Sequence, residues 1–416
     1  MRIKLNKTLA LALLGLTAFN GYADHSAHKG GQKAGHKSAH KAKSPACQAS
    51  DILCAKTVTT AFAPDGKLWR LWSAQQQLFF SVSGDNGVHY TQPQRVTIDA
   101  EKISSRGENR PKLAFSGGTH GSSNVYISWA KPLKGKYTSD IRFTYSTDGG
   151  LTFAAPQTVN NDGLHIGHSF NEMVVTEDGL VTLSWLDGRE RKRTKNYKGS
   201  ALYMAQGRLT PEGIHFNNVK LADNTCVCCR ITMKPTADNK IAAMWRHIYG
   251  DNIRDHAMMT FSEKHIPAKP IRASFDQWQI NGCPHQGPGL SISAQNRYHM
   301  VWFNNGSKGK GVFYAYSDDG GVSQSKPMSV GDFKNQAAHP NVISQGNTVD
   351  VVWTQFNGMA YQLYHQRSQD NGDSFTPAKV IAQSESDSDR PFLLKRAGRS
   401  YVSWQRPGLG HEVIAL

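Results

Sequence analysis

The chain has 416 residues, 38% of them hydrophobic and 10% aromatic, which is enough apolar content for a sizeable core. Its formal net charge is +16, but the first 23 residues carry three of these charges and residues 24–43 a further four. The remaining excess is spread along the chain and is not the concentrated basic stripe expected of a nucleic-acid-binding protein. We therefore expect no nucleic-acid partner, whereas anionic partners such as acidic glycans stay candidates.

The N-terminus has the pattern of a secretory signal peptide. Basic residues precede an apolar run at residues 8–18, and small residues lead up to Ala23. The run is shorter than the roughly 20 residues that cross a bilayer, and no later stretch approaches that length. We expect residues 1–23 to be cleaved after Ala23 and the mature protein to be periplasmic or secreted, without a membrane span.

Residues 24–45 are rich in Lys, Gly and His and lack the apolar residues of a core, so we expect a disordered tail there. Its histidines could gather transition-metal ions, because neutral imidazole is a common ligand. A solvated basic linker explains the same composition. We place the folded domain at residues 46–416.

Tryptophan recurs along the folded part of the chain at intervals of 51–60 residues. Each one closes a stretch of alternating apolar and polar residues that contains a polar turn, as in residues 173–185, and this alternation predicts half-buried strands. Helical periodicity is nearly absent. The recurring residues, which we expect in the core, are Trp72, Trp129, Trp185, Trp245, Trp302, Trp353 and Trp404.

A second turn follows in several repeats with the pattern S-x-D-x-G-x-[ST]-[FW]. Residues 146–153 and 368–375 match it in full, residues 317–323 lack only the final aromatic, and residues 83–87 are a weaker copy. Asp can bond the backbone of its own turn, and Gly supplies a positive φ. These turns resemble the Asp-box (BNR) repeats of the sialidase-like β-propeller family, and the resemblance covers nearly all of residues 46–416.

The resemblance and the repeats together imply an all-β fold, a β-propeller of four-stranded blades. Seven repeats predict seven blades, with the six-bladed ring of true sialidases as the alternative. The last repeat has strands at residues 391–396, 400–404 and 411–416 and is one strand short. We expect residues 46–53 to supply the missing strand and a Cys47–Cys54 disulfide to hold it in place.

The other four cysteines lie in two short segments, Cys226-Val227-Cys228-Cys229 and Cys283-Pro284-His285. Loops that lead into the innermost strands of a propeller converge near its axis, and these segments occupy equivalent points of adjacent repeats. Thiolates with imidazole suit Cu(I) or Zn²⁺, and an exported setting favours copper, with zinc as the second choice. The predicted metal ligands are Cys226, Cys228, Cys229, Cys283 and His285, with His168 and His339 from the flanking repeats as additional candidates.

Disulfides are the competing interpretation of these four cysteines. The C-x-C and C-C spacings are poor for closed zinc sites, which favour C-x₂₋₄-C. In an oxidising compartment, a bridge from Cys283 to the 226–229 segment is also expected to be stable. The spacing alone leaves thiols and disulfides open.

The family resemblance implies a different function. Sialidases hold a substrate carboxylate with three arginines, since a planar guanidinium pairs bidentately with a carboxylate. Arg110, Arg230 and Arg390 stand at comparable positions, although an ion pair with a neighbouring blade explains each of them equally well. Asp187 and Glu172 are candidates, by position only, for the acidic catalytic groups.

The sequence thus leads us to expect an exported metal-binding propeller that handles copper. A sialidase-like glycoside hydrolase acting on acidic glycans is the alternative, and a scaffold for a periplasmic protein partner is the third possibility. Enzymatic activity is left open.

Overall fold

The computed structural model describes residues 50–118, 123–406 and 408–416, which belong to one compact unit, Ala46–Leu416. The predicted signal peptide, the histidine-rich tail and Cys47 lie outside the described residues. The domain boundaries and the Cys47–Cys54 pairing therefore stay predictions.

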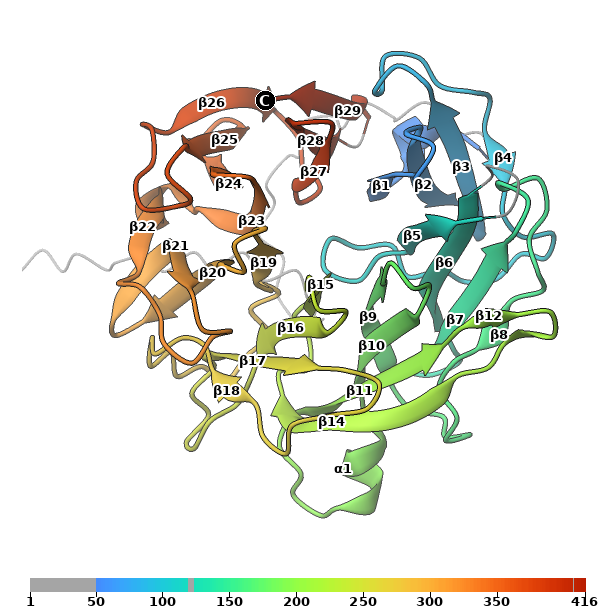
Figure 1. The fold of residues 1–416 in the computed structure, drawn as a ribbon. Helices are drawn as coiled ribbons and strands as arrows, with labels where there is room; N and C mark the ends of the chain where they lie inside the picture. The colour runs from blue at the N-terminus through green and yellow to red at the C-terminus, as the bar shows by residue number, and fades with distance from the viewer. Residues whose placement is uncertain (1–49, 119–122, 407) are drawn as a thin grey trace, which may run out of the picture. The chain divides into compact units, whose positions relative to one another are not determined.

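The described residues form seven antiparallel sheets that stand around a common axis, so the prediction of a seven-bladed β-propeller is confirmed (Figure 1). Blade 1 consists of β1 (Val58–Phe62), β2 (Leu68–Ala74), β3 (Gln77–Ser83) and β4 (Gln94–Arg95). Blade 2 consists of β5 (Lys112–Gly117), β6 (Ser123–Pro132), β7 (Ser139–Ser146) and β8 (Gln157–Thr158). Blade 3 consists of β9 (His168–Val175), β10 (Val181–Asp187), β11 (Ser200–Gly207) and β14 (Asn217–Thr225).

The remaining blades follow in chain order. Blade 4 consists of β15 (Thr232–Pro235), β16 (Ile241–Arg246), β17 (His256–Phe261) and β18 (Ile271–Arg272). Blade 5 consists of β19 (Gly289–Ile292), β20 (Tyr298–Gly306), β21 (Gly309–Ser317) and β22 (Met328–Asp332). Blade 6 consists of β23 (Ala338–Gln345), β24 (Thr348–Phe356), β25 (Tyr361–Ser368) and β26 (Lys379–Ser384), and blade 7 of β27 (Phe392–Arg396), β28 (Arg399–Arg406) and β29 (Gly410–Ala415). The first strand of each blade lies nearest the axis (Figure 1).

The seven recurring tryptophans lie on the second strand of each blade and are fully buried, which confirms them as core residues. The Asp-box turns sit between the third and fourth strands. In blade 2, the Ser146 hydroxyl accepts a bond from the Gly150 N–H over 2.8 Å, and the Asp148 carboxylate accepts one from the Thr152 N–H over 3.0 Å. Gly150 has φ +90°, and a Cβ there would lie 2.5 Å from the ring of Trp69 in blade 1. The turn therefore needs glycine both for its φ and for packing against the neighbouring blade.

Ring closure departs from the prediction at residues 52–54, whereas residues 46–49 of the predicted strand lie outside the described residues. Within the described residues blade 7 has three strands, and Ile52–Cys54 is a 3-10 turn, not a fourth strand. The turn still ties the two ends of the ring together, because the Gln405 side-chain amide donates to the carbonyls of Ile52 and Ala55 over 3.1 and 2.9 Å. Asp51 caps the turn by accepting a bond from the Leu53 N–H, and this local bond favours a turn over an extended strand.

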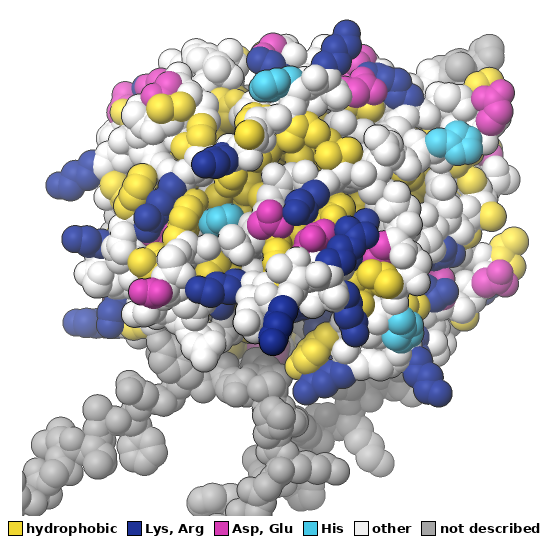
Figure 2. All heavy atoms as spheres, turned by 90° about the horizontal axis from the view of Figure 1, so that it is seen from below, with side chains coloured by type: hydrophobic (Ala, Val, Ile, Leu, Met, Phe, Trp, Pro, Cys, Tyr) yellow, Lys and Arg dark blue, Asp and Glu magenta, His cyan; other side chains and the backbone are white. Residues whose placement is uncertain are grey.

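Two short additions decorate blade 3, the helix α1 (Arg189–Arg193) between β10 and β11 and the hairpin of β12 (Leu209–Thr210) with β13 (Gly213–Ile214). Among the described residues, no helix has the length and apolar character needed to cross a bilayer. Basic side chains are scattered with acidic ones between them over the face shown in Figure 2, so the positive charge is not gathered into one stripe there.

A candidate metal centre at the propeller axis

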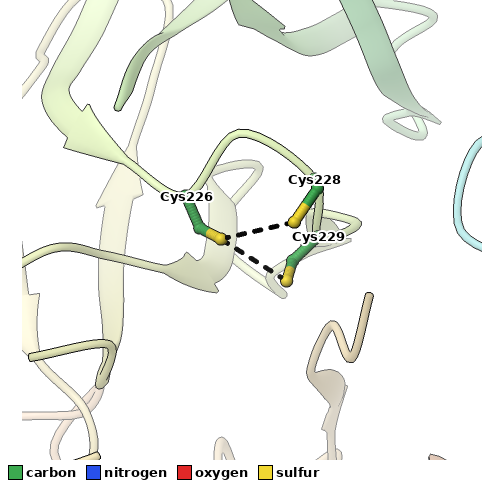
Figure 3. A group of neighbouring side chains, drawn as sticks. All are labelled: Cys226, Cys228 and Cys229. Carbon is green, nitrogen blue, oxygen red and sulfur yellow. Dashed lines mark hydrogen bonds between the residues drawn. The ribbon is translucent and has the colours of Figure 1, made fainter. Parts of the chain in front are cut away.

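Three cysteine side chains meet in the loop that leads from β14 to β15. Cys228 and Cys229 both point toward the sulfur of Cys226, at 3.8 and 3.7 Å (Figure 3). These separations are far longer than the roughly 2.05 Å of a disulfide bond, and all three are free thiols. They are buried and pack against Phe170 and Val227. The loop therefore presents three sulfur atoms around one point in apolar surroundings.

The second cysteine segment adds two further groups. The sulfurs of Cys228 and Cys283 and a ring nitrogen of His285 lie within 4.8 Å of one another, as do the sulfurs of Cys226, Cys228 and Cys229. Cys283 and His285 are exposed, whereas the other three are buried. The structure thus brings the five predicted ligands of blades 4 and 5 together, in two groups that share Cys228.

A single carboxylate joins the two segments. Glu108, in the loop that leads into β5, accepts bonds from the backbone N–H of Arg230 over 3.0 Å and of Gly287 over 2.9 Å, both on one oxygen. Its other oxygen accepts a bond from the Arg230 guanidinium over 2.6 Å. A Cβ at position 287 would lie 2.2 Å from the Arg230 side chain, so only glycine permits this approach. Cys229 directly precedes Arg230, and His285 stands two residues before Gly287. By holding Arg230 and Gly287, Glu108 therefore fixes the positions of Cys229 and His285 relative to one another.

Two arginines of blade 4 flank the thiols. The Arg254 guanidinium donates to the Cys226 sulfur over 3.2 Å and to the Asn252 side chain over 2.8 Å. The Arg246 guanidinium donates to the backbone carbonyls of Arg254 and Gln286 over 2.6 and 2.9 Å. Arg246 thus connects the β16–β17 hairpin to the segment that carries Cys283 and His285. The two cations lie where thiolate charge needs to be balanced.

This environment affects the four thiols differently. Bonds from the thiols of Cys228 and Cys229 lower the pKa of Cys226 well below its usual range, against its burial and with help from Arg254. The same bonds raise the pKa of Cys228, and burial raises that of Cys229. A bond from Cys228 lowers the pKa of Cys283 to about 7. One thiolate at Cys226, with protonated neighbours directed at it, is the arrangement that these shifts describe.

The two additional histidine candidates lie elsewhere. His168 is buried in blades 2 and 3, where its Nε2 lies 3.0 Å from the Asp162 carboxylate and its Nδ1 lies 2.8 Å from the Ser139 carbonyl. It forms a separate group with Asp162 and Asp187. His339 Nδ1 lies 3.5 Å from Glu108, so this ring is beside the carboxylate that joins the cysteine segments.

The three predicted carboxylate-binding arginines converge near the axis, but internal partners engage them. Arg110 is ion-paired with Asp389, and both side chains are 1% exposed. Arg230 is paired with Glu108, and the Arg390 guanidinium donates to the Gly107 carbonyl over 2.7 Å. Burial, together with the neighbouring Arg110 and Arg230, lowers the pKa of Arg390. The ion-pair interpretation therefore accounts for Arg110 and Arg230.

The two acidic candidates are engaged as well. Asp187 is fully buried and accepts bonds from the Trp185 indole over 2.7 Å and from the Arg189 guanidinium over 2.9 Å. Glu172 accepts a bond from the Lys112 ammonium over 2.9 Å. Burial works against ionisation of Glu172, but Lys112 more than offsets it, so the pKa of Glu172 is lowered. A lowered pKa suits a structural ion pair better than a proton donor.

Three residues of the site were missed from the sequence. Glu108 stands two positions before Arg110, and its place in the loop before an inner strand was the available signal. Arg254 follows the second strand of its blade, where the loop faces the axis, and Phe170 gives no chemical signal at all. Phe170 has φ +57°, packs against the buried cysteines, and has its ring 6.5 Å from that of His285, so it lies beside both cysteine segments.

No family model and no curated protein matches this chain. Solved structures do. A PL25 ulvan lyase bound to -[GlcA(1-4)Rha3S]- is 11% identical, with 88% of this chain and 94% of that one covered and a TM-score of 0.54. The polysaccharide lyase Uly1 is 11% identical, with 87% and 90% covered and a TM-score of 0.52. A sialidase from Trypanosoma rangeli is 10% identical, with 78% and 56% covered and a TM-score of 0.45, which is too low to support an argument.

These likenesses concern the fold. At 11% identity, the two polysaccharide lyases share the overall fold of this chain. They say nothing about which side chains of this protein carry out chemistry, because one propeller fold supports many functions.

Proposed function

We propose that this protein binds Cu(I) at the axial end of blades 4 and 5 and stores or delivers the ion in an exported compartment. The observation that supports this most is the group of three buried sulfurs, with separations of 3.7 and 3.8 Å from Cys226. A metal with bonds of about 2.3 Å to sulfur requires sulfurs roughly 3.7–4.0 Å apart in tetrahedral or trigonal geometry. Two of the three sulfur pairs already have that spacing, and the third pair lies within 4.8 Å, so binding requires little rearrangement.

The donor chemistry favours Cu(I) over harder ions. Thiolate sulfur selects Cu(I) and Zn²⁺, and the apolar contacts of Phe170 and Val227 suit a monovalent ion. Zinc is the second choice. Protons compete with the metal for thiolate and imidazole, so copper uptake falls at acid pH.

The test is a Cu(I) titration of reduced full-length protein against a chromophoric copper chelator, with elemental analysis of protein from its native compartment. Cys228→Ser and Cys283→Ser each reduce bound copper, and the loss is larger for Cys228→Ser. Cys47→Ser is the matched control, because that cysteine lies far from the site in sequence, and it leaves copper unchanged while lowering stability. Oxidation of all four cysteines in native protein, together with no copper uptake after reduction, would exclude the site.

Action on an acidic glycan is the second candidate function. The fold comparisons favour it over copper handling, since the two structures with TM-scores above 0.5 are polysaccharide lyases. Two exposed basic side chains on inner strands of the ring, Lys234 and Lys395, are suited to an anionic polymer. Incubation with uronate-containing polysaccharides, followed by ultraviolet absorbance of unsaturated products, tests for lyase activity, and a fluorogenic sialoside tests for sialidase activity. If both assays and the copper titration are negative, a scaffold function is favoured.

A further inference from the structure

The five potential ligands do not surround one point. Cys226, Cys228 and Cys229 form one close group, Cys228, Cys283 and His285 form another, and only the Cys228 sulfur belongs to both. A Cu(I) ion takes two to four ligands, so a single ion would leave part of this set unused. Resting on the copper-binding function proposed above, we propose that the site is a two-ion centre in which the Cys228 sulfur bridges an inner and an outer Cu(I).

The two positions differ in access to solvent. Cys226, Cys228 and Cys229 are 1%, 4% and 2% exposed, and Phe170 and Val227 pack against them. The outer group adds two exposed side chains, Cys283 and His285. Since a ligand from a donor or acceptor can reach only the outer position directly, copper enters and leaves there. The inner ion exchanges through the shared sulfur of Cys228.

The surrounding charges fit two monovalent ions. Four thiolates and two Cu(I) ions carry a net charge of −2, and their binding releases the remaining thiol protons to solvent. Arg254 contacts the Cys226 sulfur at 3.2 Å, and Arg246 holds the backbone of both Arg254 and Gln286. These two guanidinium groups balance the remaining charge of the filled centre.

The backbone of the outer group is held in a strained conformation at His285. His285 has φ +50° without being glycine, a conformation that persists only where its surroundings hold it. The Glu108 bond to the Gly287 N–H and the Arg246 bond to the Gln286 carbonyl hold this turn from both sides. These bonds hold the backbone from which the His285 ring extends beside Cys283 and Cys228.

The experiment is an anaerobic Cu(I) titration of the reduced full chain, with stoichiometry read by native mass spectrometry. Wild-type protein is expected to bind two Cu(I) ions. The double variant Cys283→Ser/His285→Ala and the single variant Cys226→Ser are each expected to retain one, and Cys228→Ser is expected to lose tight binding of both. X-ray absorption of the two-ion form is expected to show copper–copper scattering that the one-ion variants lack.

The outcomes separate the two proposals. If wild-type protein binds one ion and every variant loses it, the site binds copper but the two-ion centre is wrong. If wild-type protein binds no copper, the copper function itself is wrong. The exposed Cys283 and His285 can be replaced without opening the core, so this double variant decides the question even if Cys226→Ser fails to fold.

Discussion

The guanidinium of Arg230 donates a hydrogen bond to the carboxylate of Glu108 over 2.6 Å, across 122 residues of chain. Both side chains are about 5% exposed or less, so this ion pair is removed from water. Arg230 follows Cys229 directly, and the pair therefore connects the cysteine loop to the loop before β5. The Glu108 carboxylate pairs with Arg230, one of the predicted substrate-binding arginines. The same carboxylate thereby positions the candidate metal ligands.

Replacing Glu108 by Gln is expected to destabilise the fold by about 3–5 kcal/mol, because it leaves the buried charge of Arg230 without its partner. Urea unfolding measured by tryptophan fluorescence checks the value. Glu263→Gln is the matched control, since the exposed Glu263 pairs with Arg208 at the surface, where an ion pair contributes about 1 kcal/mol or less. If both variants lost the same free energy of unfolding, the buried Glu108–Arg230 ion pair would contribute no more to stability than the surface pair.

Sialoside hydrolysis is expected to stay near background. Arg110 and Arg230 are neutralised by Asp389 and Glu108, so two of the three guanidiniums that would hold a substrate carboxylate are already occupied. Turnover of a fluorogenic sialoside checks this. A kcat of about 1 s⁻¹ or more, lost on Arg390→Ala, would restore the sialidase interpretation.

Arg254 is expected to tune copper affinity without providing a ligand. Replacing it by Gln removes the bond to the Cys226 sulfur and a nearby positive charge. Partners of metal ligands typically change affinity about 10–100-fold when they are replaced. Chelator competition measures the change, and Arg297→Gln, remote on blade 5, is the control that leaves affinity unaltered. Equal affinity in the Arg254 variant would show that the guanidinium is only structural.

The fold could be predicted because its signals are local and repeat. The tryptophan on the second strand and an Asp-box turn such as residues 146–153 predict the structure of one blade. The recurrence of this pattern along the chain then predicts a ring of blades. The meeting of Cys228 and Cys283 could also be predicted, since equivalent loops of adjacent blades are neighbours. The role of Glu108 could not, because it depends on where a side chain points across the axis. The predicted closing strand at residues 46–53 does not extend to residues 52–54, because the Asp51 cap makes them a turn, and residues 46–49 lie outside the described residues.

Gln405 is expected to be essential for this closure. Its amide donates to two carbonyls of the N-terminal turn, and its side chain is 1% exposed. Gln405→Ala should destabilise the domain by about 2 kcal/mol, because it leaves buried acceptors unsatisfied. Chemical denaturation measures the loss, and Gln383→Ala, on the exposed side of β26, is the control that stays within about 0.5 kcal/mol. A loss no larger than that of the control would mean that the ring closes by other contacts.

The stability of the propeller is expected to fall between pH 6.5 and pH 4, and His299 is one of the groups responsible. This histidine on β20 is fully buried, and its Nδ1 lies 2.7 Å from the Tyr314 hydroxyl. Burial, with a smaller contribution from Arg297, lowers the pKa of His299 to about 4. The unfolded chain, with a pKa of about 6.5, binds a proton in this window that the folded chain does not.

The stabilising contribution is therefore fully present above pH 6.5 and is lost as the pH falls toward 4, by up to about 3 kcal/mol. Urea unfolding of wild type and His299→Gln at pH 7.5, 6.0 and 4.5 measures this slope. The variant is expected to lose less stability on acidification, because glutamine does not titrate but can still bond to Tyr314. His265→Gln, at an exposed position, is expected to follow the wild-type profile. A His299→Gln profile parallel to wild type would show that the acid sensitivity comes from other groups, such as the half-buried His411, whose pKa burial lowers to about 3.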